Sequence, residues 1–228
     1  MRLKVTKVKT AKQRSLSSSN WLRRQLNDEY VLKAQAEGYR SRAAYKLIEI
    51  NQKFRLIKRD SKIIDLGASP GGWSQVASKI VEKNGKIVAI DLIEMGPIQN
   101  VEFIQGDFCA QANLEILMQK MQSKASLILS DMAPNTTGHK ATDHLRIIDL
   151  CERVVDFADL ALAEGGNIVV KIFQGGAQGE LTKKLKTNFD KIKYFKPESS
   201  RKDSSELYLI ALGYNTKSKG VKLYQIPN

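Results

Sequence analysis

The spacing of apolar residues changes near residue 65. Lys62 to Leu66 form a short run, KIIDL, that is typical of a buried strand. The turn GASPGGW follows, and behind it Val76, Ala77, Ile80 and Val81 recur at helical spacing. The pattern predicts a strand over 62–67, a glycine turn that lets backbone approach a ligand, and a helix over 71–82.

Apolar strands and amphipathic helices alternate along the rest of the chain. Two helices are expected before the first strand, one ending at Gly38 and one over 42–54 with Ser41 as its N-cap. Further strands are predicted at 86–91, 101–105, 125–131, 167–173, 191–196 and 206–213, and further helices at 111–121, 143–163 and 180–188.

This alternation predicts an α/β fold of the Rossmann-like type, with a mostly parallel seven-stranded sheet and helices on both faces. Only a polar loop separates the last two strands, so they are expected to pair antiparallel. An antiparallel last strand distinguishes this pattern from a plain nucleotide-binding fold.

The composition indicates a polyanionic partner. The 228 residues carry a net charge of +13 and have a pI near 9.7, which favours nucleic acid over a merely solvated lysine-rich surface. No apolar run approaches the length of a membrane span. Cys109 and Cys151 lie far apart and have no metal-ligand spacing, so we expect reduced thiols, no metal site and a cytoplasmic protein.

The charge also suggests the domain boundaries. Residues 1–27 contain no acid before Asp28 and are expected to form a basic arm along phosphates, although such a start also resembles a mitochondrial transit peptide. Residues 28–214 are expected to form one catalytic domain. The tail, 215–228, carries three lysines and is expected to be loosely ordered.

Four predicted strands end in or just before an aspartate: Asp65, Asp91, Asp107 and Asp131. Each alone is explained as a turn former or cap. Together they favour a ligand site, because the carboxyl ends of parallel strands meet at one sheet edge.

The glycine turn narrows the choice of cofactor. The run from Gly67 reads GASPGG and lacks the second glycine of the dinucleotide fingerprint, which disfavours NAD. Trp73 stands where a phosphate-binding loop needs lysine. A nucleoside cofactor without phosphate at this position, such as S-adenosylmethionine, is compatible with both departures.

Two charged residues interrupt apolar strands. Lys171 lies within IVVKIF, where a lysine needs a partner or a function, and Glu206 opens ELYLIALG. Because the last strand is predicted antiparallel, Glu206 is expected at the same edge as Asp131 and Lys171. Lys46 is a further candidate from the N-terminal helix.

The segments GASPGGW, SDMAPN, VVKIF and SRAAYKL resemble the FtsJ-like RNA 2′-O-ribose methyltransferases over about residues 20–213, and most of all their bacterial branch. The resemblance implies a catalytic tetrad at Lys46, Asp131, Lys171 and Glu206. It also implies S-adenosylmethionine as cofactor, with contacts at Gly71, Trp73, Asp91, Asp107 and Asp131.

The resemblance further implies methylation of a uridine 2′-hydroxyl in the A-loop of large-subunit (23S) ribosomal RNA, within the 50S subunit and by a monomer. Relatives that act on tRNA, mitochondrial rRNA or mRNA caps leave other RNA substrates open. A non-catalytic assembly factor is the main rival class, and the +13 charge disfavours a small-molecule methyltransferase.

Two roles for Lys171 remain open. A neutral amine beside Lys46 would accept the hydroxyl proton, whereas Asp131 and Glu206 favour an ammonium that stabilises a developing alkoxide. Base methylation is disfavoured, because Asn135 replaces the aromatic residue expected after the proline and both cysteines lie away from the strand ends.

Overall fold

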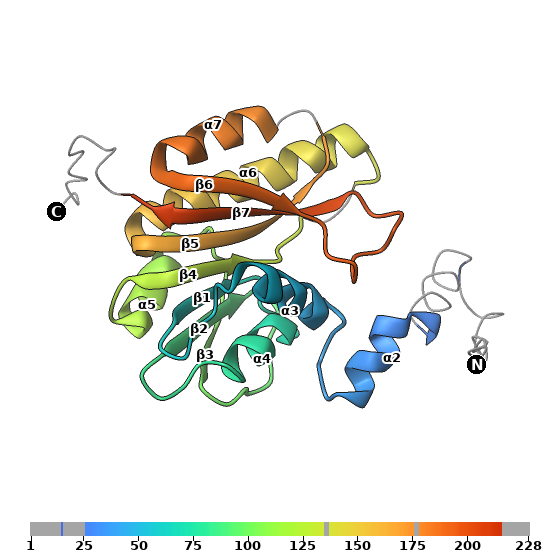
Figure 1. The fold of residues 1–228 in the computed structure, drawn as a ribbon, viewed down its shortest axis with the longest axis horizontal. Helices are drawn as coiled ribbons and strands as arrows, with labels where there is room; N and C mark the ends of the chain where they lie inside the picture. Colours follow the sequence, from blue (N-terminus) through green and yellow to red (C-terminus); the bar gives the residue numbers. More distant parts are fainter. Residues whose placement is uncertain (1–14, 16–25, 135–136, 176–177, 216–228) are drawn as a thin grey trace.

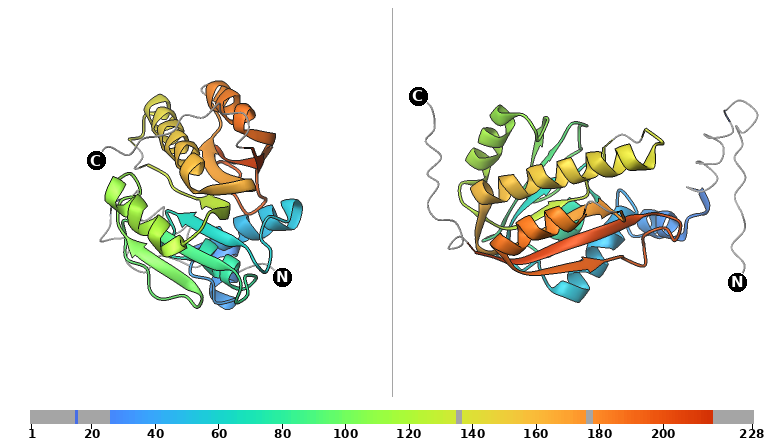
Figure 2. Two further views of the ribbon diagram at one scale, coloured as in Figure 1. Left: turned by 90° about the vertical axis from the view of Figure 1, so that its left-hand side faces the viewer. Right: turned by 90° about the horizontal axis from the view of Figure 1, so that it is seen from above.

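The computed structural model describes residue 15 and residues 26–134, 137–175 and 178–215. Most of the predicted basic arm (1–27) and tail (215–228) lies outside these ranges. Helices cover both faces of one twisted sheet (Figures 1 and 2). No helix in the described ranges is long and apolar enough to cross a bilayer.

The sheet has seven strands in the order β3-β2-β1-β4-β5-β7-β6. Only β7 runs against the others, since it pairs antiparallel with both β5 and β6. The predicted Rossmann-like α/β fold with an antiparallel last strand is therefore confirmed. The strands are β1 (Lys62–Leu66), β2 (Lys86–Asp91), β3 (Val101–Gln105), β4 (Ala125–Ser130), β5 (Leu162–Phe173), β6 (Phe189–Phe195) and β7 (Glu206–Tyr214).

Two hydrophobic cores hold the helices against the sheet. Ile63 packs with α3 (Ala43–Phe54) and α4 (Gly72–Ser78) on one face. Ile64 faces the opposite core, built with α5 (Gln111–Met121), α6 (Lys140–Ala161) and α7 (Gln178–Asn188). Because successive strand residues point to opposite faces, the central strands are mostly apolar, and the buried Asp65 in β1 and Lys171 in β5 are charged exceptions.

The N-terminal helix α2 (Glu29–Ala36) packs outside this sandwich, against α3. The rings of Tyr30 and Tyr45 lie 5.5 Å apart across the two helices. Asp28 caps α2 by accepting from the backbone N–H of Tyr30 at 3.1 Å. The segment that joins α2 to α3 lies beside the carboxyl end of β1, because Arg40 in this segment donates to the carbonyl of Pro70 in the following turn. Ligands bind at the carboxyl ends of parallel strands in such folds.

Some predicted boundaries were wrong. Ser41 is not an N-cap, because α3 begins at Ala43 and Arg42 precedes it without a side-chain cap. The Ser41 hydroxyl packs against Gly72, where an added Cβ would lie 2.3 Å from Ser41 Oγ. α4 ends at Ser78, α6 spans 140–161, and β5 begins at Leu162 with an irregular stretch before Asn167.

Candidate active site

Four charged side chains from four elements form two ion pairs at the carboxyl edge of the sheet. Lys171 Nζ, on β5, lies 3.1 Å from Asp131 Oδ1, just after β4. Lys46 Nζ, on α3, lies 2.7 Å from Glu206 Oε2, at the start of β7. All four side chains are at most 18% exposed, so the charges are largely shielded from water.

Tyr208 lies between the two ion pairs and contacts one residue of each. Its hydroxyl donates to Asp131 Oδ1 at 2.6 Å, and Lys46 Nζ lies 5.8 Å from the centre of its ring. Tyr208 is the register partner of Lys171 and follows Glu206 by two residues, so all three share one face of the sheet. Sequence reasoning missed this residue, although the period of two along ELYLIALG carries the signal.

The surroundings keep Asp131 ionised. Burial alone would raise the pKa of Asp131, but Lys171, Lys46 and the Tyr208 hydroxyl outweigh burial and hold it below its ordinary value. Burial and the neighbouring carboxylates raise the pKa of Tyr208 well above that of free tyrosine. Asp131 is therefore a carboxylate at neutral pH, and Tyr208 is a neutral hydrogen-bond donor.

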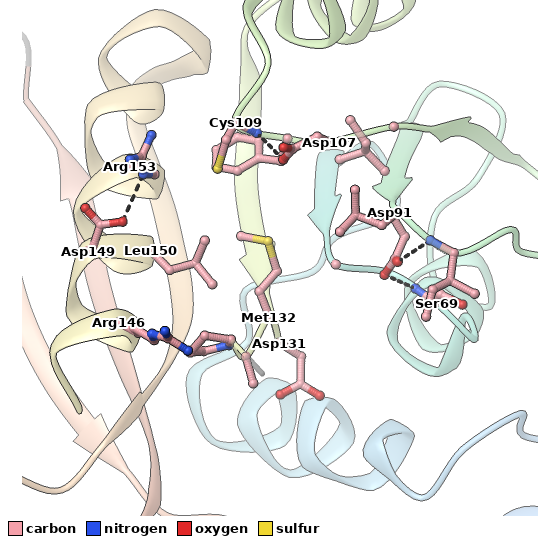
Figure 3. A pocket seen from close by; sticks show the side chains of 18 of the residues that line it. Ser69, Asp91, Asp107, Cys109, Asp131, Met132, Arg146, Asp149, Leu150 and Arg153 are labelled. Carbon is pink, nitrogen blue, oxygen red and sulfur yellow. Dashed lines mark hydrogen bonds and ion pairs between the residues drawn. The ribbon is translucent and has the colours of Figure 1, made fainter. Parts of the chain in front are cut away.

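A cavity of about 880 Å³ adjoins the Lys171–Asp131 pair, because Asp131 forms part of its wall (Figure 3). Ser69, Asp91, Asp107 and Asp131 line it from the strand ends, and Arg146, Asp149 and Arg153 line it from α6. Asp91 accepts from the backbone N–H groups of Ser69 at 2.9 Å and Ile93 at 2.8 Å. Asp107 accepts from the N–H of Cys109 at 2.8 Å. The backbone thus fixes two carboxylates at the cavity wall.

This set of acceptors suits S-adenosylmethionine. Its ribose hydroxyls, adenine amino group and ammonium group are donors, and carboxylates are their natural acceptors. Asp91, Asp107 and Asp131 would hold the cofactor. The cavity is within the usual size range for small-molecule sites.

Gly71 and Trp73 are not among the residues that line this cavity, although both lie in the described chain. The Trp73 ring is buried against Tyr208, 5.6 Å away between centroids, and its indole N–H donates to the Ala43 carbonyl at 2.8 Å. Gly71 takes φ +108° and touches the loop after β2. Cofactor contacts at these two residues remain predictions.

A second, smaller hollow of about 250 Å³ opens over the Lys46–Glu206 pair. Arg42 and Arg201 line it, and both guanidinium groups also contact the carboxylate of Asp28. Ser200 donates its hydroxyl to the other Glu206 oxygen at 2.8 Å. Two cations therefore lie beside the Lys46–Glu206 pair, in a hollow that shares no lining residue with the larger cavity.

Asp65 lies behind the glycine turn and is 1% exposed. Burial raises the pKa of Asp65 to about 7, the hydrogen bond from Ser74 opposes this rise, and Asp131 and Asp91 add to it. Asp65 Oδ1 is buried without a hydrogen-bond partner in the described structure. A neutral acid at Asp65 is therefore favoured below pH 7.

This environment predicts a pH-dependent stability. The folded pKa lies above the unfolded value, so the protein loses stability as the pH rises from about 4 through about 7. Between pH 6 and 8 the contribution of Asp65 to the free energy of unfolding should fall by about 1.4 kcal/mol. Asp65→Asn should lack this contribution, as judged by urea unfolding at both pH values. Equal pH dependence in the two proteins would contradict an uncharged Asp65.

Comparison with known proteins agrees with this geometry. Residues 39–214 match the model of the FtsJ-like methyltransferase family. Proteins named ribosomal RNA large subunit methyltransferase E are 54% identical in Rickettsia akari and 55% identical in Rickettsia felis, in each case over 92% of this chain and 95% of the relative.

A crystal structure of a ribosomal RNA methyltransferase from Plasmodium falciparum is 34% identical, with a TM-score of 0.68. The match covers 77% of this chain and 98% of that one. The family match spans the whole sheet, both ion pairs and the aspartate-lined cavity. The chain belongs to the FtsJ-like methyltransferase family, whose methyl donor is S-adenosylmethionine.

Proposed function

We propose that this protein transfers a methyl group from S-adenosylmethionine to the 2′-hydroxyl of a uridine in 23S ribosomal RNA. The names of the relatives at 54–55% identity support ribosomal RNA as the substrate. We extend the proposal to the A-loop of the 50S subunit in the cytoplasm, with a monomeric enzyme. Residues 28–214 would carry catalysis, with 1–27 and 215–228 as basic extensions.

The observation that carries the proposal is the Lys171–Asp131 pair at the edge of the cofactor cavity, 3.1 Å between Nζ and Oδ1. When bound, S-adenosylmethionine supplies a methyl group on a positively charged sulfur. A ribose hydroxyl attacks such a carbon only when it is aligned and its proton is handled. In this proposal Lys171 and Asp131 would do both.

The contacts of Lys171 favour electrostatic stabilisation over proton acceptance. Its ammonium faces the Asp131 carboxylate and also donates to the Asp131 backbone carbonyl. Both contacts use Lys171 as a hydrogen-bond donor. In this role Lys171 would donate a hydrogen bond to the oxygen as negative charge develops there. Lys46, held by Glu206 at 2.7 Å, would add a second positive charge.

The RNA backbone would enter over Arg42 and Arg201. Their hollow adjoins Lys46 and Glu206, and guanidinium groups bind phosphates in a bidentate manner. The net charge of +13 would supply the longer-range attraction. Asp28 occupies both arginines in this structure, so a phosphate would compete with its carboxylate.

The function is tested by incubating the full chain with radiolabelled S-adenosylmethionine and, separately, unmethylated 50S subunits, naked 23S rRNA, tRNA and mitochondrial rRNA. We expect label in the 50S RNA at a single uridine, in a dinucleotide that resists alkaline hydrolysis because its 2′-oxygen is blocked. Label on tRNA or mitochondrial rRNA alone would show that this RNA, and not 23S rRNA, is the substrate. Binding of 50S subunits without label would favour a non-catalytic assembly factor.

A further inference from the structure

Arg40 ties together two loops that come from different parts of the chain. Its Nη1 donates to the carbonyl of Gly96 at 2.7 Å and to that of Pro70 at 3.3 Å, and its Nη2 donates to the carbonyl of Pro97 at 2.7 Å. Arg40 itself belongs to the segment between α2 and α3. Within the described residues Arg40 forms no ion pair with an acidic side chain. The acceptors of its guanidinium group are therefore backbone carbonyl oxygens.

Both loops contribute residues to the wall of the cofactor cavity. Pro70 lies in the glycine turn that includes the cavity residues Gly67 and Ser69. Gly96 and Pro97 follow Asp91, Leu92 and Ile93, which line the same cavity from the end of β2. The Ser69 N–H to Asp91 hydrogen bond, 2.9 Å long, already joins the two loops inside the cavity. Arg40 joins them again on the outside.

The loops meet with little space between them. A Cβ at Gly71 would lie 2.6 Å from Ile98, 2.8 Å from the Met95 sulfur and 3.2 Å from Arg40 Nη1. These atoms are the ends of flexible side chains, which can shift, so the backbone φ of +108° is what favours glycine at this position. The Arg40 guanidinium group lies over the contact between the two loops.

We propose that Arg40 is a positioning residue that holds the glycine turn and the loop after β2 in the geometry that binds S-adenosylmethionine. The planar guanidinium group reaches three carbonyl oxygens at once, which a lysine ammonium on a flexible stem does not reproduce in one fixed geometry. Without this tie the loop that carries Leu92 and Ile93, each 67% exposed, has fewer contacts to order it before the cofactor arrives. The inference rests on the assignment of the cavity to S-adenosylmethionine.

The competing explanation is that Arg40 contacts RNA. The side chain is exposed, and its Nε–H and one Nη2–H are not engaged in the three carbonyl contacts. A phosphate contact would affect RNA binding and leave cofactor affinity unchanged. The two roles are therefore separable by measuring each ligand alone.

The test compares Arg40→Gln with the unaltered protein by calorimetric titration with S-adenosylhomocysteine in the absence of RNA. We expect the Kd for S-adenosylhomocysteine to rise about tenfold. The reason is that the variant loses one to two net hydrogen bonds that order the loops before the ligand binds. Arg40→Lys should fall between the two proteins. In the cofactor-free protein, backbone amides of residues 92–96, 98 and 99 should exchange faster in Arg40→Gln, a readout that is independent of activity.

Lys79→Gln is the matched control, because it removes a positive charge that lies 3.8 Å from the centre of the Tyr39 ring and that has no hydrogen bond or ion pair to either loop among the described residues. Its Kd should stay within twofold of the unaltered protein. A Kd and an exchange rate that do not change in Arg40→Gln would overturn the inference, and so would a rise confined to the KM for RNA. If Arg40→Gln does not fold, Arg40→Lys decides by the same criteria. Failure of the unaltered protein to bind S-adenosylhomocysteine would remove the cofactor assignment itself.

Discussion

Replacing Lys171 with methionine is expected to lower the rate of methyl transfer by about 10³-fold while cofactor binding persists. Methionine keeps most of the buried apolar stem and removes only the ammonium, so β5 and its antiparallel pairing with β7 should survive. The lost interactions are the contact with Asp131 at 3.1 Å and the hydrogen bond that we propose to the reacting oxygen. Single-turnover rates with saturating RNA and cofactor measure the chemical step directly.

Lys171→Arg is the informative companion variant. A guanidinium keeps the positive charge but does not act as a proton acceptor at neutral pH. If Lys171 stabilises charge, the arginine variant should keep more activity than the methionine variant, with an unchanged pH–rate profile. A profile whose rising limb disappears in Lys171→Arg would establish Lys171 as the base. A methionine variant with more than a tenth of the normal rate would exclude both roles.

Much of the fold follows from the sequence because local patterns and topology agree. The strands at 62–66, 86–91 and 101–105 lie within one residue of their predicted limits, since each apolar run is bounded by a turn signal. The antiparallel β7 was predictable from a connection too short for a crossover helix. That topology is also what brings Glu206 to the edge where Asp131 and Lys171 lie.

Contacts between distant segments were not predictable in the same way. Ser41 has the residue type of a cap, but its hydroxyl is buried against Gly72, which lies 31 positions later. The packing of the Trp73 ring on Tyr208 in the core was not predicted either, and a cofactor contact at Trp73 stays a prediction. Arg40 shows no sequence signal, because its three acceptors are backbone carbonyls, which every residue has. The positions of such groups depend on how close two loops come.

The close approach of two segments also makes the fold sensitive to a single added methyl group at Gly67. Gly67 has φ +72°, and an added Cβ would lie 2.2 Å from Met132 Cγ and 3.2 Å from Met132 Cα. The Cα is backbone, so rotation of the methionine side chain does not relieve the whole clash. Met132 follows Asp131 directly, and a shift there moves the carboxylate that contacts Lys171. Both Gly67 and Met132 also line the cofactor cavity.

Gly67→Ala is therefore expected to lower the free energy of unfolding by about 3 kcal/mol, from left-handed backbone strain plus overpacking. Gly165→Ala is its control, because Gly165 has φ +73° with nothing within 4 Å of an added Cβ. The control should lose roughly 1 kcal/mol from backbone strain alone. Urea unfolding gives both values, and titration with S-adenosylhomocysteine should show weaker binding only in Gly67→Ala. Equal losses in the two variants would mean that Met132 shifts at little cost, and would refute the close packing of the glycine turn against the segment after β4 that carries Asp131.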